Sequence, residues 1–230
     1  MGSVIAVIPA RGGSKRIPKK NIKLFLGKPL IAYSIETAQK SGLFDRIVVS
    51  TDDTDVAEIA IEYGAEIPFM RPKELSDDHT SAVEVVENTL ARMEKEGESI
   101  RYACTIYPTA PLLEAEYLIE GLERLKDSNA LYTFSATSMP FPIWRTFRID
   151  EDGGCEMFWP EHFNSRSQDL EEAFQDAGQF YWQKRLPDMP SFRFDKFAAP
   201  VILPRHLVQD IDTPEDWRRA ELMYEVLKRR

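Results

Sequence analysis

Residues 4–21 read VIAVIPARGGSKRIPKKN and decide the fold of this chain. Residues 4–9 are a short apolar run rich in β-branched side chains, which indicates a buried strand. Two adjacent glycines open the loop behind it, and residues 11–23 contain six lysines and arginines and no acid. In open parallel sheets, ligands bind beyond the carboxyl ends of the strands, and the first such loop is the usual phosphate site. The stretch therefore predicts an α/β protein that binds an anion at its first loop.

Outward from this stretch, short β-branched runs alternate with amphipathic helical patterns. Further strands are predicted at residues 46–50, 65–69, 102–107 and 131–137. Helices are predicted at residues 29–41, 53–63, 81–96 and 114–126. This rhythm predicts a three-layer, Rossmann-like α/β fold with a mainly parallel central sheet. Strands return at residues 179–182 and 208–211, and a closing helix is predicted at residues 214–228.

Chain length and rhythm predict a single domain over residues 1–230 with one excursion. The rhythm stops at residues 139–169, which are rich in proline, glycine and aromatic residues and lack a helical period. We interpret this segment as an excursion from the main sheet. Three of the four tryptophans and several phenylalanines fall between residues 141 and 182. They fit a sugar pocket and a buried dimer contact equally well.

Composition excludes several classes of partner. The formal net charge of −9 opposes binding to a phosphate backbone, so no nucleic-acid partner is expected. The first apolar run is too short to span a bilayer and no cleavage-like sequence follows it, which predicts neither membrane insertion nor secretion. Cys104 and Cys155 lie in unlike surroundings and suggest no disulfide framework or metal knot. A cytoplasmic location is expected.

The chemistry of the first loop favours a polyphosphate ligand. Gly12 and Gly13 allow the backbone to approach an anion closely, Ser14 adds a hydroxyl, and the surrounding cations supply charge. On charge alone, a merely solvated surface loop is an equal alternative. The Gly-Gly-Ser sequence directly after a buried strand favours the phosphate site. The loop matches neither a P-loop nor the glycine spacing of a dinucleotide fold, which removes support for ATP hydrolysis and hydride transfer.

Two carboxylates near the end of the chain suggest a metal site. Asp210 and Asp212 are two residues apart in a predicted strand, so both side chains point to one face. Mg²⁺ prefers one or two carboxylates together with phosphate oxygens and water. The alternative is that Asp212 caps the last helix, but Thr213 and Pro214 already supply a cap and a first-turn proline. Asp53, in contrast, is predicted to cap the helix that follows it.

Other functional classes find less support in the sequence. The three histidines, His79, His162 and His206, have no nucleophile spaced for a catalytic triad. A glycosyltransferase also uses an Asp-x-Asp metal motif, but that motif normally follows an inner strand in mid-chain, where this chain has Tyr107-Pro108-Thr109. A nucleotide-binding protein without catalytic activity is the other alternative. Retention of both the cationic loop and the carboxylate pair argues against it.

Several motifs, taken in order, resemble one family of nucleotidyltransferases. They are Ile8–Lys15 with Pro18–Asn21, Gly27–Ile31, Phe44–Asp52, Arg71–Pro72, Tyr107–Leu112 and Asp210–Thr213. Together they resemble the CMP-sialic acid synthetase, or acylneuraminate cytidylyltransferase, family over essentially the whole chain. Segments 140–143, 166–170, 176–182 and 201–205 resemble the branch of that family that activates pseudaminic acid.

The resemblance implies a nucleotide-diphospho-sugar transferase-like fold. It also implies a reaction in which the anomeric hydroxyl of a nonulosonic acid attacks the α-phosphorus of CTP, giving the CMP-sugar and pyrophosphate. Pseudaminic acid is the expected sugar, and N-acetylneuraminic or legionaminic acid are the alternatives. Mg²⁺ is the implied cofactor. A homodimer is implied, with residues 139–169 serving both dimerisation and the sugar pocket.

The resemblance also assigns roles to individual residues. Catalytic roles fall on Arg11, Lys20 and Asp212, and the metal ligands are Asp210 and Asp212. CTP contacts fall on Ala10, Arg11, Gly12, Gly13, Ser14, Lys15, Lys20, Asn21, Arg71, Asp78 and Ser81. Sugar contacts fall on Tyr107, Gln168, Gln179, Phe180 and Tyr181. Tyr107 stands where the sialic acid enzymes have glutamine, so this departure bears on the choice of sugar.

Overall fold

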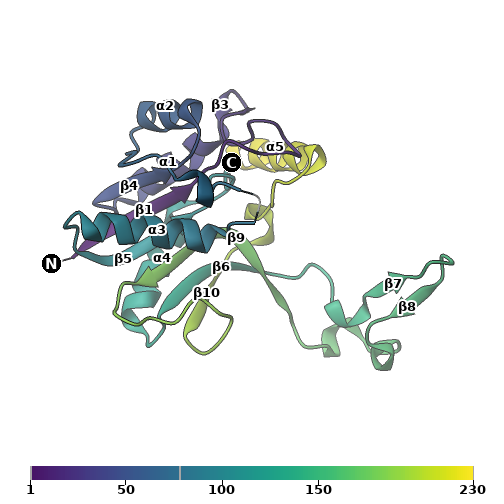
Figure 1. Ribbon diagram of the computed structural model, residues 1–230. Coiled ribbons are helices and arrows are strands. Elements are labelled where there is room, and N and C mark those ends of the chain that lie inside the picture. The colour runs from purple at the N-terminus through teal and green to yellow at the C-terminus, as the bar shows by residue number, and fades with distance from the viewer. Residues whose placement is uncertain (1, 78, 230) are drawn as a thin grey trace.

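A six-stranded, mostly parallel sheet forms the centre of the computed structural model, which describes residues 2–77 and 79–229 (Figure 1). The order across the sheet is β10-β6-β9-β5-β1-β4. The strands are β1 (Ser3–Pro9), β4 (Arg46–Ser50), β5 (Ile100–Ile106), β6 (Tyr132–Ser138), β9 (Phe174–Lys184) and β10 (Ala198–Ile202). Only β9 runs antiparallel to its neighbours β5 and β6. The predicted mainly parallel α/β fold is confirmed.

Helices cover both faces of the sheet and complete three layers. One face packs against α1 (Leu30–Ser41), α2 (Thr54–Glu62) and α4 (Ala115–Asp127). The other face packs against α3 (Ala82–Lys95), through Val86, Leu90 and Met93. A smaller core joins α5 (Pro214–Lys228) to the hairpin of β2 (Leu24–Phe25) and β3 (Lys28–Pro29). No helix within the described residues is both long and apolar enough to cross a bilayer.

Two predicted strands need correction, and one strand of the structure was not predicted. Residues 65–69 form no strand, and only Glu66 bridges to Val48 beside the edge strand β4. Residues 208–211 are also not a strand, although Ile211 is fully buried between two exposed or half-exposed aspartates. The strand β10 was not predicted, because its five residues include Pro200 and show no alternation of polar and apolar side chains. As an edge strand it tolerates that proline.

A bulge interrupts β9 opposite Ser135 in the middle of β6, beside the end of β5 at Ile106. Phe134 pairs with Tyr181 and Ala136 pairs with Asp176, so residues 177–180 of β9 stand opposite Ser135 alone. Bulges of this kind bend a strand and re-aim its side chains. Because β9 is antiparallel, the bulge lies where the parallel strands end, an edge that we call the carboxyl edge of the sheet.

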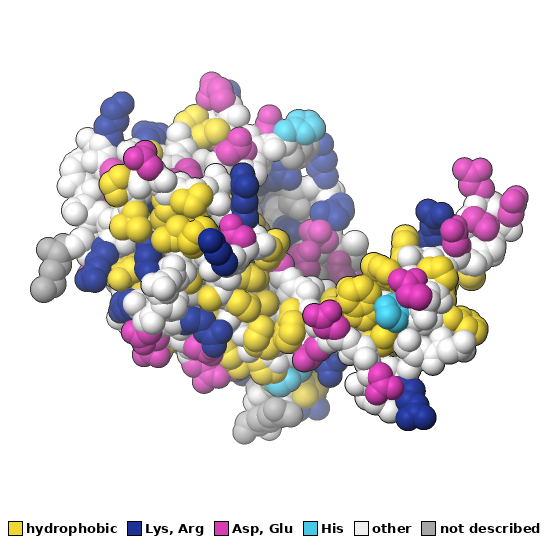
Figure 2. Space-filling view, turned by 90° about the horizontal axis from the view of Figure 1, so that it is seen from below, with side chains coloured by type: hydrophobic (Ala, Val, Ile, Leu, Met, Phe, Trp, Pro, Cys, Tyr) yellow, Lys and Arg dark blue, Asp and Glu magenta, His cyan; other side chains and the backbone are white. Residues whose placement is uncertain are grey.

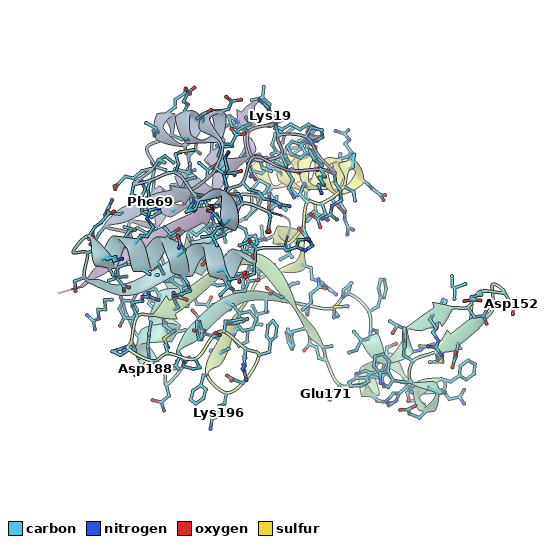
Figure 3. All side chains as sticks on the ribbon, viewed as in Figure 1. Lys19, Phe69, Asp152, Glu171, Asp188 and Lys196 are labelled. Carbon is cyan, nitrogen blue, oxygen red and sulfur yellow. The ribbon has the colours of Figure 1, made fainter. Side chains whose placement is uncertain are left out.

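Residues 139–173, here called the arm, leave the sheet between β6 and β9 (Figure 1). The arm contains a hairpin of β7 (Phe147–Ile149) and β8 (Cys155–Met157), with Asp152 at its far tip (Figure 3). Its own small core is a ring cluster in which Trp144 lies 5.3 Å from Trp159 and 5.7 Å from His162. Its hydrophobic side chains remain largely exposed within this chain (Figure 2), namely Phe141, Phe147, Ile149, Phe158 and Phe163.

Candidate active site

The carboxyl ends of β1 and β4 are joined through one carbonyl group. The Ser50 carbonyl oxygen accepts a hydrogen bond from the Ala10 amide at 2.9 Å and another from the Arg71 guanidinium. Arg71 is only 7% exposed, and burial lowers its pKa despite the attraction of Asp52. A buried guanidinium at this position fixes the start of the cationic loop, residues 10–23, against β4. The predicted CTP ligand Arg71 therefore also has a structural role.

Gly12 lies in a position that only glycine fits. A Cβ atom built on it would lie 2.3 Å from Asp53 Oδ2, far inside van der Waals contact. Its amide donates to Asp52 Oδ1 at 3.0 Å, while Asp53 Oδ1 accepts from the amides of Asp55 and Val56 and caps α2. The predicted capping role of Asp53 is confirmed. The loop backbone therefore passes closely over the N-terminus of a helix.

We expect Gly12→Ala to displace the loop or the cap. Loss of a helix cap costs about 0.5–2 kcal/mol, so the melting temperature should fall and the KM for CTP should rise. Gly13→Ala is the matched control for stability, because no described atom lies within 4 Å of a Cβ at that position. Thermal melts and CTP titrations of both variants check this. Equal melting temperatures for the two variants would contradict the assignment.

A small apolar core brings the cationic loop to the carboxylate pair. Ile17 and Ile211 are both buried in it against Trp217 of α5. As a result, Lys20 Nζ donates to the Ile211 carbonyl at 2.6 Å and lies 3.3 Å from Asp212 Oδ1. The Arg16 guanidinium lies 2.8 Å from Asp212 Oδ2. Residues about 190 positions apart in sequence thus form one charged cluster.

Asp210 and Asp212 lie on the same side of the chain because Ile211 between them is buried. Partial burial and the charge of Asp212 raise the pKa of Asp210, and Lys20 opposes this rise. The last helix is capped by Thr213, whose hydroxyl accepts from the Asp216 amide at 3.2 Å in a reciprocal capping box. Neither Asp210 nor Asp212 is needed for that cap, which leaves both carboxylates for another role.

The donor set of the pair fits a magnesium ion that is completed by a nucleotide. Among the residues that the structure describes, no three acidic, histidine or cysteine side chains gather as a complete metal cage. The two carboxylates repel one another and lie beside the cationic loop. Mg²⁺ commonly binds one or two carboxylates and takes its remaining ligands from phosphate and water. The assignment of Asp210 and Asp212 as metal ligands stays a prediction that this chemistry supports.

The loop before α3 closes over the cationic loop. The Arg11 guanidinium donates to the Asp77 carbonyl at 2.9 Å, and Asp77 Oδ1 accepts from the amides of His79 and Thr80. Ser81 caps α3 in a capping box with Glu84, so its hydroxyl already has a structural partner. Asp78 lies outside the described residues. These contacts tie Arg11 to the loop that leads to Ser81, a predicted CTP ligand.

The remaining predicted phosphate residues stay together in the cationic loop. Asn21 is 7% exposed and its side-chain amide donates to the Arg11 carbonyl at 2.8 Å. It therefore closes the loop from inside. Lys15 and Gly13 are exposed, and the Ser14 amide donates to the Gly12 carbonyl at 3.0 Å in the tight turn between them. Their contacts with CTP stay predictions.

Tyr107, Gln179 and Tyr181 meet on the other side of the carboxyl edge. The Tyr107 amide donates to the Gln179 carbonyl at 2.9 Å, and the rings of Tyr107 and Tyr181 lie 5.8 Å apart. Burial raises the pKa of Tyr107, and the negative charges of Asp176 and Asp210 add to this rise. The Gln179 side chain is buried and donates to the Leu207 carbonyl, but its Oε1 has no donor among the described residues.

Two predicted sugar residues lie elsewhere in this chain. The predicted sugar contact of Phe180 needs correction, because this side chain is fully buried and packs beneath Gly121 of α4. Side chains alternate along β9, so Phe180 faces away from Tyr181. Gln168 is exposed in a short 3₁₀ turn of the arm. The arm as a whole extends away from the sheet (Figure 1). Within one chain the structure does not bring Gln168 to Tyr107.

A groove of about 820 Å³ extends from these tyrosines along β5 beneath α3. At the carboxyl edge it is lined by Thr105, Tyr107, Asp176, Tyr181, Phe192 and Phe194. Sequence reasoning missed Asp176 and the two phenylalanines. The phenylalanines lie in a loop without periodicity, and the approach of Asp176 to the tyrosines depends on the bulge in β9. The site thus has a cationic side, where we expect the phosphates of CTP, and a largely apolar side, where we expect the acceptor sugar and which we call the acceptor side.

Comparison with known proteins agrees with this division. A family model described as Cytidylyltransferase matches residues 5–141, more than half of the chain. The chain belongs to the cytidylyltransferase family. This cytidylyltransferase is 44% identical to the pseudaminic acid cytidylyltransferase of Campylobacter jejuni serotype O:2, with 96% of each chain covered. It is 33% identical to the CMP-N,N'-diacetyllegionaminic acid synthase of Legionella pneumophila, with 97% of each covered.

The fold of the cytidylyltransferase is also found in a solved structure. CMP:2-keto-3-deoxy-manno-octonic acid synthetase complexed with CTP is similar, with a TM-score of 0.69 over 97% of this chain and 99% of that one. The two sequences are 16% identical, so the likeness concerns the fold. The expected membership and the nucleotide-diphospho-sugar transferase-like fold are both confirmed, and the chain is a nucleotidyltransferase.

Proposed function

We propose that this enzyme transfers CMP from CTP to the anomeric hydroxyl of pseudaminic acid and releases pyrophosphate. The observation that carries the proposal is the cluster of Lys20, Asp212 and Asp210, which faces the cationic loop on one side and Tyr107 on the other. Phosphoryl transfer needs positive charge on the phosphates and an acceptor placed in line with the leaving group. A site with a phosphate side and an acceptor side meets both needs.

The cations of the loop bind and orient the triphosphate. Arg11 is held by the Asp77 carbonyl and Lys20 by the Ile211 carbonyl, so both heads are preorganised, and Lys15 adds charge at the exposed turn. Asp210 and Asp212 would hold the magnesium ion, whose charge would add to the neutralisation of the reacting phosphate. A metal ion held by the two carboxylates would also offset the repulsion between them.

The acceptor side favours pseudaminic acid over sialic acid. Pseudaminic acid carries a methyl group where sialic acid has a terminal hydroxymethyl, and an acetamido group in place of one hydroxyl. The walls near Tyr181 include Phe192 and Phe194, which suit that less polar molecule. The 44% identity to an enzyme named for pseudaminic acid supports the same choice.

A homodimer completes the proposal. The arm, residues 139–173, presents exposed hydrophobic side chains on a segment that extends away from its own sheet (Figure 2). Packing against a second copy would cover them and would bring Gln168 toward the partner's acceptor side. We place the reaction in the cytoplasm, where CTP is available and both cysteines persist as thiols.

Pyrophosphate release from CTP tests the proposal. We expect release with CTP, Mg²⁺ and pseudaminic acid, and none after chelation of the metal. N,N'-diacetyllegionaminic, N-acetylneuraminic and 3-deoxy-manno-octulosonic acids are compared under one condition. An apolar wall rejects an added hydroxyl by only about 10²-fold, so kcat/KM should favour pseudaminic acid by at least that factor once mismatched hydrogen bonds are included. Equal use of N-acetylneuraminic acid would overturn the choice of sugar and leave the cytidylyltransferase assignment intact.

A further inference from the structure

Asp176 and Tyr181 contact each other although their spacing forbids it in a regular strand. Residues five apart in a β-strand point to opposite faces of the sheet. Here the Tyr181 hydroxyl donates to Asp176 Oδ2 at 2.5 Å. The bulge at residues 177–180 provides the explanation, because it takes four residues of β9 past a single residue of β6. The bulge therefore turns the carboxylate to the same side as the tyrosine.

Two side chains hold the bulge in this shape. Ser135 Oγ accepts hydrogen bonds from the amides of Gln179 at 3.0 Å and Phe180 at 3.2 Å, both within the bulge. Asp176 Oδ1 accepts from the Gly178 amide at 2.9 Å. Gly178 has a φ of +62°, the left-handed conformation that favours glycine. Buried amides left without an acceptor are costly, so these contacts are structural requirements of the bulge.

The bulge reaches the acceptor side directly. The Gln179 carbonyl within it accepts from the Tyr107 amide, and the rings of Tyr107 and Tyr181 lie in contact. Asp176 lines the groove together with both of them. Burial and the Asp176 carboxylate raise the pKa of both tyrosine hydroxyls, so each is protonated at neutral pH. None of these groups contacts the cationic loop through a described hydrogen bond.

We propose that Asp176 and Ser135 are positioning residues for the sugar acid, through the orientation that they impose on Tyr181. A phenol has one proton to donate. The O–H group of Tyr181 is used in its hydrogen bond to Asp176. The phenol oxygen and the remaining lone pairs of the carboxylate therefore present only acceptors to the groove. Such a surface selects a donor on the sugar, and an acetamido N–H is the donor that fits the proposed substrate. This inference rests on the proposed function.

Kinetics of four variants test the inference. Asp176→Asn can donate to the Tyr181 oxygen and turn its proton outward, Tyr181→Phe removes the hydroxyl, and Ser135→Ala removes the acceptor for two amides. Asp188→Asn is the control: it makes the same change at an exposed residue that lines the groove far from the bulge (Figure 3). Asparagine also tolerates its φ of +54°. KM for each substrate and kcat are measured for all four, alongside thermal melts.

We expect Asp176→Asn to raise the KM for the sugar acid about 10-fold or more, in the range of a lost hydrogen bond to a charged group, while the KM for CTP stays within about 2-fold. Tyr181→Phe should also raise the KM for the sugar acid. Asp188→Asn should change neither that KM nor the KM for CTP. An unchanged KM for the sugar acid, or parallel changes in both constants, would overturn the inference. If Ser135→Ala fails to fold, the Asp176 and Tyr181 variants decide.

The proposed function is tested separately from this inference. It is judged on the wild type alone, by whether pseudaminic acid is the preferred substrate. The positioning role is judged on the KM for the sugar acid in each variant divided by that of the wild type. The sugar acid is whichever one the wild type uses.

Discussion

Asp212→Asn should reduce CMP transfer by about 10²-fold or more, because it removes one charge of the proposed metal site with little change in volume. The same substitution also removes the anion that Lys20 and Arg16 contact. Asp210→Asn should have a similar effect on turnover. Initial rates over a range of Mg²⁺ concentrations measure the loss and show whether excess metal restores part of it.

Thermal melts without metal supply the control. Burial and Asp212 raise the pKa of Asp210, so its ionised form opposes folding at neutral pH. Asp210→Asn should therefore melt no lower than the wild type while losing activity, and the difference in stability between the two should narrow as pH falls through the raised pKa of Asp210. Near-normal turnover in both variants would refute the metal assignment. A lower melting temperature for Asp210→Asn would contradict the electrostatic argument.

Lys20→Ala and Arg11→Ala should each lower turnover at saturating CTP by about 10²-fold, because preorganised cations act on charge that develops in the transition state. The Lys20 ammonium and the Arg11 guanidinium each donate a hydrogen bond to a backbone carbonyl. Neither charged group therefore needs to become ordered during the reaction. A four-variant comparison under one condition measures this effect.

Lys19→Ala and Lys23→Ala are the matched controls from the same loop. Lys19 Nζ lies 2.5 Å from Asp55 on α2, and Lys23 Nζ lies 4.6 Å from the centre of the Trp217 ring. Both cations thus contact the protein body, and we expect changes of only a few-fold. Equal losses in all four variants would mean that the loop acts as a diffuse field and not through placed contacts.

The sequence was sufficient for the parts of the site that are local. The cationic loop directly after a buried strand and the Asp-x-Asp pair could be found from residue type and spacing alone. Their contact through Lys20 could not, because it depends on Ile17 and Ile211 meeting in one small core. Even the failed strand at residues 208–211 kept the alternation that turns the two aspartates to one side.

The acceptor side was less predictable for a physical reason. Periodicity assigns faces only while a strand remains regular, and β9 departs from regularity at the bulge. Gln179, Phe180 and Tyr181 were predicted together, yet alternation places Phe180 in the core. Asp176 was missed because its approach to Tyr181 exists only in the bulged strand. The residues on the acceptor side could therefore be assigned only from the structure, whereas the cationic loop could be found from the sequence.

The central position of β9 also orders the assembly of the sheet in time. β6 pairs with β9 and β10 and has no ladder with β5, although it is synthesised next after it. The strands β4, β1 and β5 can associate while the chain is still emerging, but β6 must wait until the arm has been made and β9 inserts beside β5. Such long-range pairing is slow and leaves strand edges open. The same late strand that builds the sugar-facing wall is thus the one that joins the two halves of the sheet during folding.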